Sequence, residues 1–121
     1  MQDFRSLNVW HKSHALVLAI YRSTSTFPRD ELFGLTSQLR RSASSIPANI
    51  AEGCGRGGGD FGRFLGIAAG SASESEYHIL LARDLGYLTT VQSESLTADV
   101  HEVKRMLTAL IQRTKAQKTD D

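Results

Sequence analysis

Four histidines stand in a chain of 121 residues, and they raise the question of a metal centre. His11 and His14 are three residues apart, so on a helix they would share a face and could bind a metal ion adventitiously. A di-metal centre inside a helix bundle uses a different pattern, a Glu-x-x-His pair on each of two helices. Neither His78 nor His101 has a glutamate three residues before it. The histidines are therefore expected to be structural or exposed, and the sequence predicts no metal site and no cofactor.

The stretch "GCGRGG", from Gly53 to Gly58, matches the spacing of the dinucleotide-binding motif G-x-G-x-x-G. That motif binds pyrophosphate between a strand and a helix of a parallel sheet, whereas this stretch follows a helical pattern. The structural interpretation is a flexible joint between two helices. A phosphate could still meet the start of the next helix beside Arg56, because helix N-termini attract anions, but Asp60 at that start opposes an anion.

Cys54 is the one cysteine of the chain, and serines cluster between Ser42 and Ser45. A single cysteine excludes a disulfide within the chain and suits a reducing cytoplasm. Nucleophilic catalysis would need a base organised beside the thiol or a hydroxyl, and no such arrangement is readable in the sequence. The serines also lack the strand-turn-helix context of a nucleophilic serine. The chain is therefore predicted not to be an enzyme.

Basic residues carry the remaining functional signal. Several arginines flank the Gly-rich joint, against only Glu52 and Asp60 in that stretch, and a second basic group follows late in the chain. The candidate nucleic-acid-binding residues are Arg40, Arg41, Arg56, Arg63, Lys104 and Arg105. The alternative is a solvated helix face or ion pairs between subunits, because charge runs alone are weak signals. The formal net charge of +1 means that any nucleic-acid surface would be a local patch.

Apolar residues recur at helical spacing in four segments, and no segment alternates as a strand would. The expected helices span about residues 7–27, 35–53, 60–85 and 95–114, and a polar tail covers 115–121. Asp60 is expected to be the N-cap of the third helix. One face of that helix is expected to carry a stripe of mostly apolar residues: Phe61, Phe64, Leu65, Ala68, Ala72, Ser75, Ile79 and Ala82. Four amphipathic helices with short connections predict an all-α fold, an up-and-down antiparallel four-helix bundle, in one domain over residues 1–121. The longest apolar run, Ala15 to Ile20, is far shorter than a membrane span.

The second segment keeps its helical phase through Pro47. Its apolar residues are spaced by four or three throughout: Leu35, Leu39, Ala43, Ile46, Ile50 and Gly53. A proline inside a helix removes one backbone hydrogen bond and costs about 3 kcal/mol, so we expect an unbroken helix that is kinked at Pro47. Small residues surround the proline, and a second small-residue run, "GIAAGSAS", covers Gly66 to Ser73. Two such faces permit close backbone approach, so these helices are expected to pack on each other or on a neighbouring subunit.

Several polar residues lie near the apolar stripes of the second and third helices: Asn49, Glu52, Glu74 and Glu76. We expect part of this group to be shielded from solvent. A shielded carboxylate needs a partner, because an unpaired buried charge is costly. The candidate partners are Arg40, Arg41, Arg63 and Arg83.

Four stretches carry a family resemblance: "LNVW", "FGLTSQLRRSASSIPANIAEG", "DFGRFLGIAAGSASESE" and "ARDLGYL". The chain resembles, roughly from Phe4 to Arg113, the four-helix-bundle family of proteins encoded in 23S ribosomal RNA intervening sequences. The resemblance implies a ring-like homopentamer, a cytoplasmic location and no established catalytic activity. The residues expected to serve structure and assembly are Pro47, Asn49, Glu52, Gly53 and Glu74.

The family is similar to the accessory proteins of diversity-generating retroelements, which are pentameric bundles that bind reverse transcriptase and nucleic acid through basic surfaces. This chain departs from them, because it is nearly neutral and they are strongly basic. Two hypotheses therefore stay open. One is an RNA-binding homo-oligomer that uses the basic residues, and the other is a protein-interaction scaffold without nucleic-acid binding.

Overall fold

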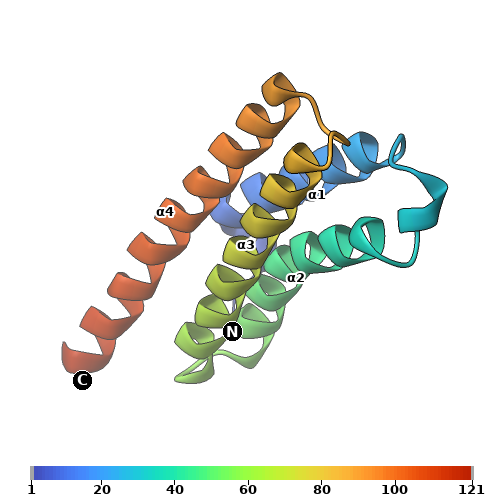
Figure 1. Ribbon diagram of the computed structural model, residues 1–121. Helices are drawn as coiled ribbons and strands as arrows, with labels where there is room; N and C mark the ends of the chain where they lie inside the picture. The colour runs from blue at the N-terminus through green and yellow to red at the C-terminus, as the bar shows by residue number, and fades with distance from the viewer. Residues whose placement is uncertain (1, 121) are drawn as a thin grey trace.

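The computed structural model describes residues 2–120, so the two ends of the predicted domain, Met1 and Asp121, lie outside the described residues. Figure 1 shows a protein made of long helices. They are α1 (Asn8–Thr24), α2 (Leu35–Arg56), α3 (Asp60–Asp84) and α4 (Thr90–Asp120), with short 3-10 turns η1 (Phe4–Ser6) and η2 (Arg29–Glu31). No strand occurs within residues 2–120. The all-α prediction is confirmed.

Each helix packs against the next helix in the chain, and α4 closes the arrangement by packing against α1. In the described part of the chain, the diagonal pairs, α1 with α3 and α2 with α4, have no two Cα atoms within 8 Å of each other. Figure 1 shows α2 and α3 side by side, joined by a short turn, with α4 returning along α3. This is the up-and-down four-helix arrangement that the sequence predicted.

The core forms where the apolar stripes of the four helices meet. Each helix contributes side chains that are almost completely buried, such as Leu16 on α1, Leu39 on α2 and Leu107 on α4. Spacings of three or four residues place these side chains on the inward face of each helix. The predicted stripe of α3 is confirmed from Phe64 to Ala82, where its members are buried. Burying one large aliphatic side chain of this kind contributes about 1.5–3 kcal/mol.

α2 runs without a break through Pro47, whose side chain is buried. The helical phase predicted across the proline is therefore confirmed. A kink at Pro47 stays a prediction, because continuity of a helix does not fix the direction of its axis. Close to the proline, the side-chain N–H of Asn49 donates to the carbonyl of Ser45 at 2.8 Å and to the hydroxyl of Ser45 at 2.9 Å. Asn49 therefore stabilises the turn of α2 that contains the proline.

α2 and α3 pack together along a seam of small residues. The hydroxyl of Ser75 donates to the hydroxyl of Ser42 at 2.9 Å, and the hydroxyl of Ser71 donates to the hydroxyl of Ser45 at 3.0 Å. Near the end of the seam, Gly53 is so close to α3 that a Cβ atom added to it would meet the nearest atom of α3 at 3.0 Å. The predicted close contact between these two helices is confirmed.

Two predicted helix ends around the first and third helices are wrong. α1 ends at Thr24 rather than near 27, because the N–H of Phe27 turns back to the carbonyl of Thr24 at 3.1 Å just before Pro28. Asp60 is the first residue of α3 and not its N-cap, which is Gly59. The carboxylate of Asp60 makes no capping bond because it pairs with arginines instead.

The fourth helix is longer at both ends than the sequence pattern indicated. It begins at Thr90 rather than near 95, because Thr89 and Gln92 form a capping box. The hydroxyl of Thr89 accepts from the N–H of Gln92 at 3.1 Å, and the side-chain oxygen of Gln92 accepts from the N–H of Thr89 at 2.9 Å. At the other end, residues 115–120 of the predicted polar tail are helical. That stretch contains good helix formers and neither glycine nor proline.

Candidate functional site

At the joint between α2 and α3, two of the candidate arginines lie in a row of alternating charges. Arg56 pairs with Glu52 at 3.2 Å and with Asp60 at 3.6 Å. Arg63 pairs with the second carboxylate oxygen of Asp60 at 3.7 Å. Both guanidinium groups also lie near the ring of Phe64, with their central carbons 5.1 and 4.5 Å from its centroid. Two carboxylates balance the two positive charges, so the joint is not a free basic patch in the protomer.

Arg40 and Arg41 are adjacent in α2 but lie in different surroundings. Arg40 donates from Nε to the hydroxyl of Thr24 at 2.8 Å and from Nη2 to the carbonyl of Tyr21 at 3.3 Å. Its guanidinium also lies over the ring of Tyr21, 4.6 Å from the centroid. A cation beside the last carbonyls of α1 is favourable because of the helix dipole, so Arg40 anchors α2 to α1. Arg41 is exposed, and its side chain has no ion pair or hydrogen bond within residues 2–117.

Lys104 and Arg105 differ in the same way on α4. Lys104 pairs with Glu76 of α3 at 3.2 Å, and His101 pairs with the second oxygen of Glu76 at 2.9 Å. The hydrogen bond from His101, assisted by Lys104, lowers the pKa of the Glu76 carboxyl below its ordinary value. This cluster joins α3 to α4. Arg105 is exposed and, like Arg41, has no partner in the part of the chain that the structure describes.

The two candidate residues without partners do not form one patch. Arg41 is on α2 and Arg105 is on α4, and these diagonal helices do not contact each other. A basic surface built from both residues would therefore have to combine more than one protomer. The nucleic-acid site stays a prediction, and it concerns Arg41 and Arg105 more than the four residues that already have partners.

The sequence predicted the wrong partners for the carboxylates near the seam. Glu76 is shielded as expected, with its side chain 34% exposed, whereas the side chains of Glu52 and Glu74 are 52% and 61% exposed. The observed partners are Arg56 for Glu52, His78 for Glu74, and His101 with Lys104 for Glu76. None of the predicted partners pairs with these carboxylates in the described residues: Arg40, Arg41, Arg63 and Arg83. The rotation of each helix about its own axis decides which basic residue, one turn away or on the next helix, comes within reach of a given carboxylate.

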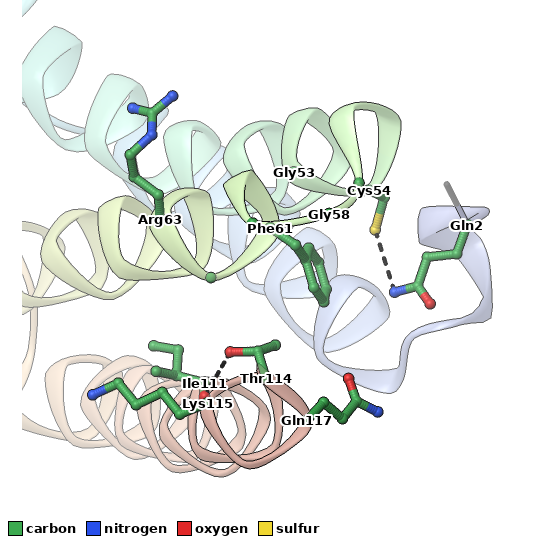
Figure 2. Close-up of a pocket in the computed structure, with 13 residues that line it drawn as sticks. Gln2, Gly53, Cys54, Gly58, Phe61, Arg63, Ile111, Thr114, Lys115 and Gln117 are labelled. Atoms are coloured by element: carbon green, nitrogen blue, oxygen red, sulfur yellow. Dashed lines mark hydrogen bonds between the residues drawn. The ribbon is translucent and has the colours of Figure 1, made fainter. Parts of the chain in front are cut away.

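A pocket of about 630 Å³ opens between the α2–α3 joint and the last turns of α4 (Figure 2). Its wall at the joint is glycine backbone, where Gly57 and Gly58 have φ angles of 67° and 58° that favour glycine. Figure 2 shows the ring of Phe61 directed toward α4 and the guanidinium of Arg63 directed away from that ring. α2 extends to Arg56, three residues beyond the predicted end at Gly53, so only Gly57 and Gly58 of the G-x-G-x-x-G stretch lie in the turn between the two helices.

Cys54 lines the same pocket, but its thiol is covered. The residue is 1% exposed, and Gln2 donates its side-chain N–H to the sulfur at 3.8 Å (Figure 2). Burial raises the pKa of the thiol, which disfavours the reactive thiolate. Cys54 behaves as a small buried residue, as the sequence predicted.

One buried histidine lies in a line with a serine and a carboxylate. Nδ1 of His78 is 3.2 Å from the hydroxyl of Ser42, and Nε2 is 3.9 Å from the carboxylate of Glu74. The order resembles a nucleophile, a base and an acid. Ser42 is buried, however, and its hydroxyl also contacts the carbonyl of Leu39 at 3.2 Å within α2. The contact between His78 and Ser42 therefore joins α3 to α2, and the hydroxyl of Ser42 is not presented to solvent.

The two early histidines make local contacts. His11 bonds through Nε2 to the carbonyl of Arg5 at 2.7 Å, and His14 stacks on Trp10 with ring centroids 5.0 Å apart. Within residues 2–117, no group of three or more histidine, cysteine, aspartate or glutamate side chains is placed to hold a metal ion.

The comparisons with known proteins agree with this four-helix arrangement. A sequence profile of the 23S rRNA-intervening sequence protein family matches residues 5–109. The chain belongs to this family. It is also 32% identical to a protein of unknown function from Bacteroides thetaiotaomicron, assigned to the S23 ribosomal protein family, whose crystal structure matches with a TM-score of 0.76 over 85% of this chain and 97% of that chain. Among curated proteins, none matches the chain.

The chain exposes apolar side chains on α3 that the sequence reasoning did not identify. Ile67, Tyr77 and Leu80 are 42%, 58% and 42% exposed. Gly70 and Ser73, which are exposed between them, add little bulk. We call these five residues the α3 face. The sequence did contain a sign of this face, because α3 carries apolar residues outside its buried stripe and is therefore apolar on two sides.

A second exposed apolar set lies on α1. Leu18 and Tyr21 are 45% and 44% exposed, and Ala15 is exposed one turn before Leu18. We call these three residues the α1 face. These exposed residues do not create a membrane span: in the described part of this intervening-sequence protein, no helix is both long and apolar enough to cross a bilayer.

Proposed function

We propose that this member of the family is a non-enzymatic cytoplasmic protein that assembles into a homopentamer and acts as a protein-interaction scaffold. The α3 face carries the proposal. Apolar side chains that a soluble bundle leaves in contact with water favour association, since covering them contributes roughly 25 cal/mol per Å². Gly70 and Ser73 on the same face would let a neighbouring helix approach closely.

Burial of the candidate nucleophiles supports a role without catalysis. Cys54 is 1% exposed and Ser42 is 5% exposed, so a substrate would reach neither group without opening the bundle. The pocket beside Cys54 has no organised general base in contact with the thiol, whose side-chain partner is the amide of Gln2.

The charges favour a protein partner over RNA. Arg56 and Arg63 share Asp60, and Lys104 shares Glu76 with a histidine. RNA phosphates would have to compete with these carboxylates for the same cations. The formal net charge of +1 supplies little long-range attraction for RNA.

Affinity capture with and without nuclease tests the scaffold. A tagged full-length chain should recover the same protein partners from cell extract after RNase and DNase treatment. Partners that disappear after nuclease treatment would contradict a scaffold and favour RNA binding. The variant Ile67→Arg is a useful control, because a partner held through the assembled particle should be lost with it.

RNA binding is the second candidate function, and the residues that support it are Arg41 and Arg105. Both are exposed and without partners in the described residues, and a homopentamer would repeat each of them on every subunit. In filter binding, structured RNA should be retained at low salt, and its affinity should fall steeply as salt rises. The double variant Arg41→Ala with Arg105→Ala should reduce both the affinity for RNA and the steepness with which that affinity falls as salt rises. Absence of retention at low salt would remove this candidate.

A further inference from the structure

The α1 face and the α3 face point in opposite directions. α1 and α3 are diagonal in the bundle, with no two Cα atoms within 8 Å of each other in the described residues, so their exposed sides lie on opposite edges of the protomer. Each face contains large apolar side chains that are between 42% and 58% exposed. A single self-complementary surface would suffice for a two-fold dimer. Two separate apolar edges instead suit an assembly in which each copy touches two neighbours.

The charges of the two helices are opposite in sign. α1 contains Arg22 and Lys12 and no acidic residue, and Lys12 is already paired with Asp99 and Glu102 of α4 at 3.5 and 3.2 Å. α3 contains four acidic residues and two arginines, a net charge of −2. Arg22 is exposed without a partner in the described residues, and the side chain of Glu74 is 61% exposed. Contact between unlike helices would join opposite charges, whereas contact between two copies of the same helix would join like charges.

We propose that the α1 face of one copy binds the α3 face of the next copy, which makes the contact heterologous. The inference rests on the proposed homo-oligomer and names the surfaces that build it. A heterologous contact between two edges of a subunit generates a ring when the rotation closes. A closed ring with an odd number of subunits requires such a contact, because its subunits cannot all be paired face to face.

Three single variants test which surfaces are used. Leu18→Arg places a charge in the α1 face, and Ile67→Arg places a charge in the α3 face. Val91→Arg is the matched control, because Val91 is 76% exposed on α4 and lies outside both faces. By light scattering at micromolar concentration, the control should keep the mass of the unmodified protein. Each of the other two variants should fall to the protomer mass of 13.3 kDa. Helical circular dichroism shows that each variant still folds.

Mixing the two defective variants separates this contact from other arrangements. A Leu18→Arg copy keeps its α3 face, and an Ile67→Arg copy keeps its α1 face, so an equimolar mixture should form a complex of two chains and stop there. The mass should double relative to either variant alone. A mixture that stays at the protomer mass overturns the inference. So does a Leu18→Arg variant that assembles normally, since association through α3 alone would tolerate it.

The unmodified chain distinguishes this inference from the function on which it rests. If the unmodified chain is itself a protomer at micromolar concentration, the proposed homo-oligomer is wrong. If the unmodified chain assembles and Leu18→Arg assembles equally well, the homo-oligomer stands and the α1 contact is wrong.

Discussion

Gly53 is the residue on which the close packing of α2 against α3 depends most directly. A Cβ atom at this position would lie 3.0 Å from the Cβ of Phe64 and 3.1 Å from a ring carbon of Phe61. Both distances are shorter than a comfortable contact, so either the aromatic side chains or the helix would have to shift. Gly55, two residues later in α2, has no atom within 4 Å of such a Cβ.

The variants Gly53→Ala and Gly55→Ala should therefore change stability in opposite directions. Overpacking at Gly53 costs about 1–3 kcal/mol, against a gain of about 1 kcal/mol or less in helix propensity. At Gly55 only the gain applies, about 0.5–1 kcal/mol. Urea unfolding of the two variants measures the difference directly. Equal midpoints would show that the seam is looser than the structure indicates.

Glu76 provides a pH-dependent contribution to stability. Its pKa is lowered below the ordinary value of 4.5, chiefly by the hydrogen bond from His101. A lowered pKa in the folded state stabilises the protein above the unfolded-state pKa, and this contribution is lost as the pH falls through the folded-state pKa. The carboxylate is partly exposed, so its ion pair with Lys104 contributes about 0.2–1 kcal/mol at neutral pH. The hydrogen bond between His101 and Glu76 at 2.9 Å adds to this contribution.

Replacing Glu76 with glutamine should remove this contribution. Near pH 7, Glu76→Gln should unfold at lower urea concentration than the unmodified protein. The difference should shrink as the pH is taken below about 4.3, where the carboxyl also gains its proton in the unfolded chain. The exposed Glu94, which has no ion pair within residues 2–120, gives the control Glu94→Gln, for which no such pH-dependent difference is expected. A Glu76→Gln deficit that stays constant down to the acid range would contradict the ion-pair account.

At the scale of the helix, α4 depends on a capping box that the apolar pattern did not reveal. Thr89 and Gln92 bond to each other's backbone N–H groups, which satisfies two donors at the start of the helix. Thr89→Ala should cost about 1 kcal/mol, a typical value for the loss of an N-cap hydroxyl. Thr108 is a matched control, because its hydroxyl bonds to the carbonyl of Lys104 within the exposed middle of α4. Thr108→Ala should be neutral or slightly stabilising, and equal losses in thermal unfolding would contradict the capping role.

Helical phase made most of the fold predictable. The spacing from Leu35 to Gly53 predicted an unbroken α2 through Pro47, and the stripe from Phe64 to Ala82 predicted the buried side of α3. Both are local patterns with many residues, so one exception does not change the result. Helix ends were harder to predict, because one or two polar side chains decide them. The start of α4, set by two side-chain hydrogen bonds, is the clearest case.

The candidate site was predictable only in part, because pairing depends on how helices rotate against each other. The sequence made Arg40 a candidate for binding nucleic acid or for pairing with a carboxylate, but packing places it over Tyr21 at the end of α1. It also treated Glu74 and Glu76 alike, although Glu76 faces α4 and Glu74 faces solvent. The apolar residues of the α3 face were missed because a buried stripe on the same helix already accounted for an amphipathic pattern.

At the scale of the whole molecule, the protein is a nearly neutral bundle with two exposed apolar edges. Arg56, Arg63 and Lys104 are paired with carboxylates within the protomer, and the candidate nucleophiles are buried. What remains available for association with another copy is the outer surface of the helices, chiefly the α3 face. An assembly that covers this face would remove apolar surface from water and would repeat the remaining surface on each subunit.

The mass of the unmodified protein in solution tests this account most directly. Light scattering on a size-exclusion column at micromolar concentration should give about five times the protomer mass of 13.3 kDa. The value should persist on dilution through the micromolar range. A mass of one protomer throughout that range would contradict the account, because Ile67, Tyr77 and Leu80 would then be stable in water without a second copy to cover them.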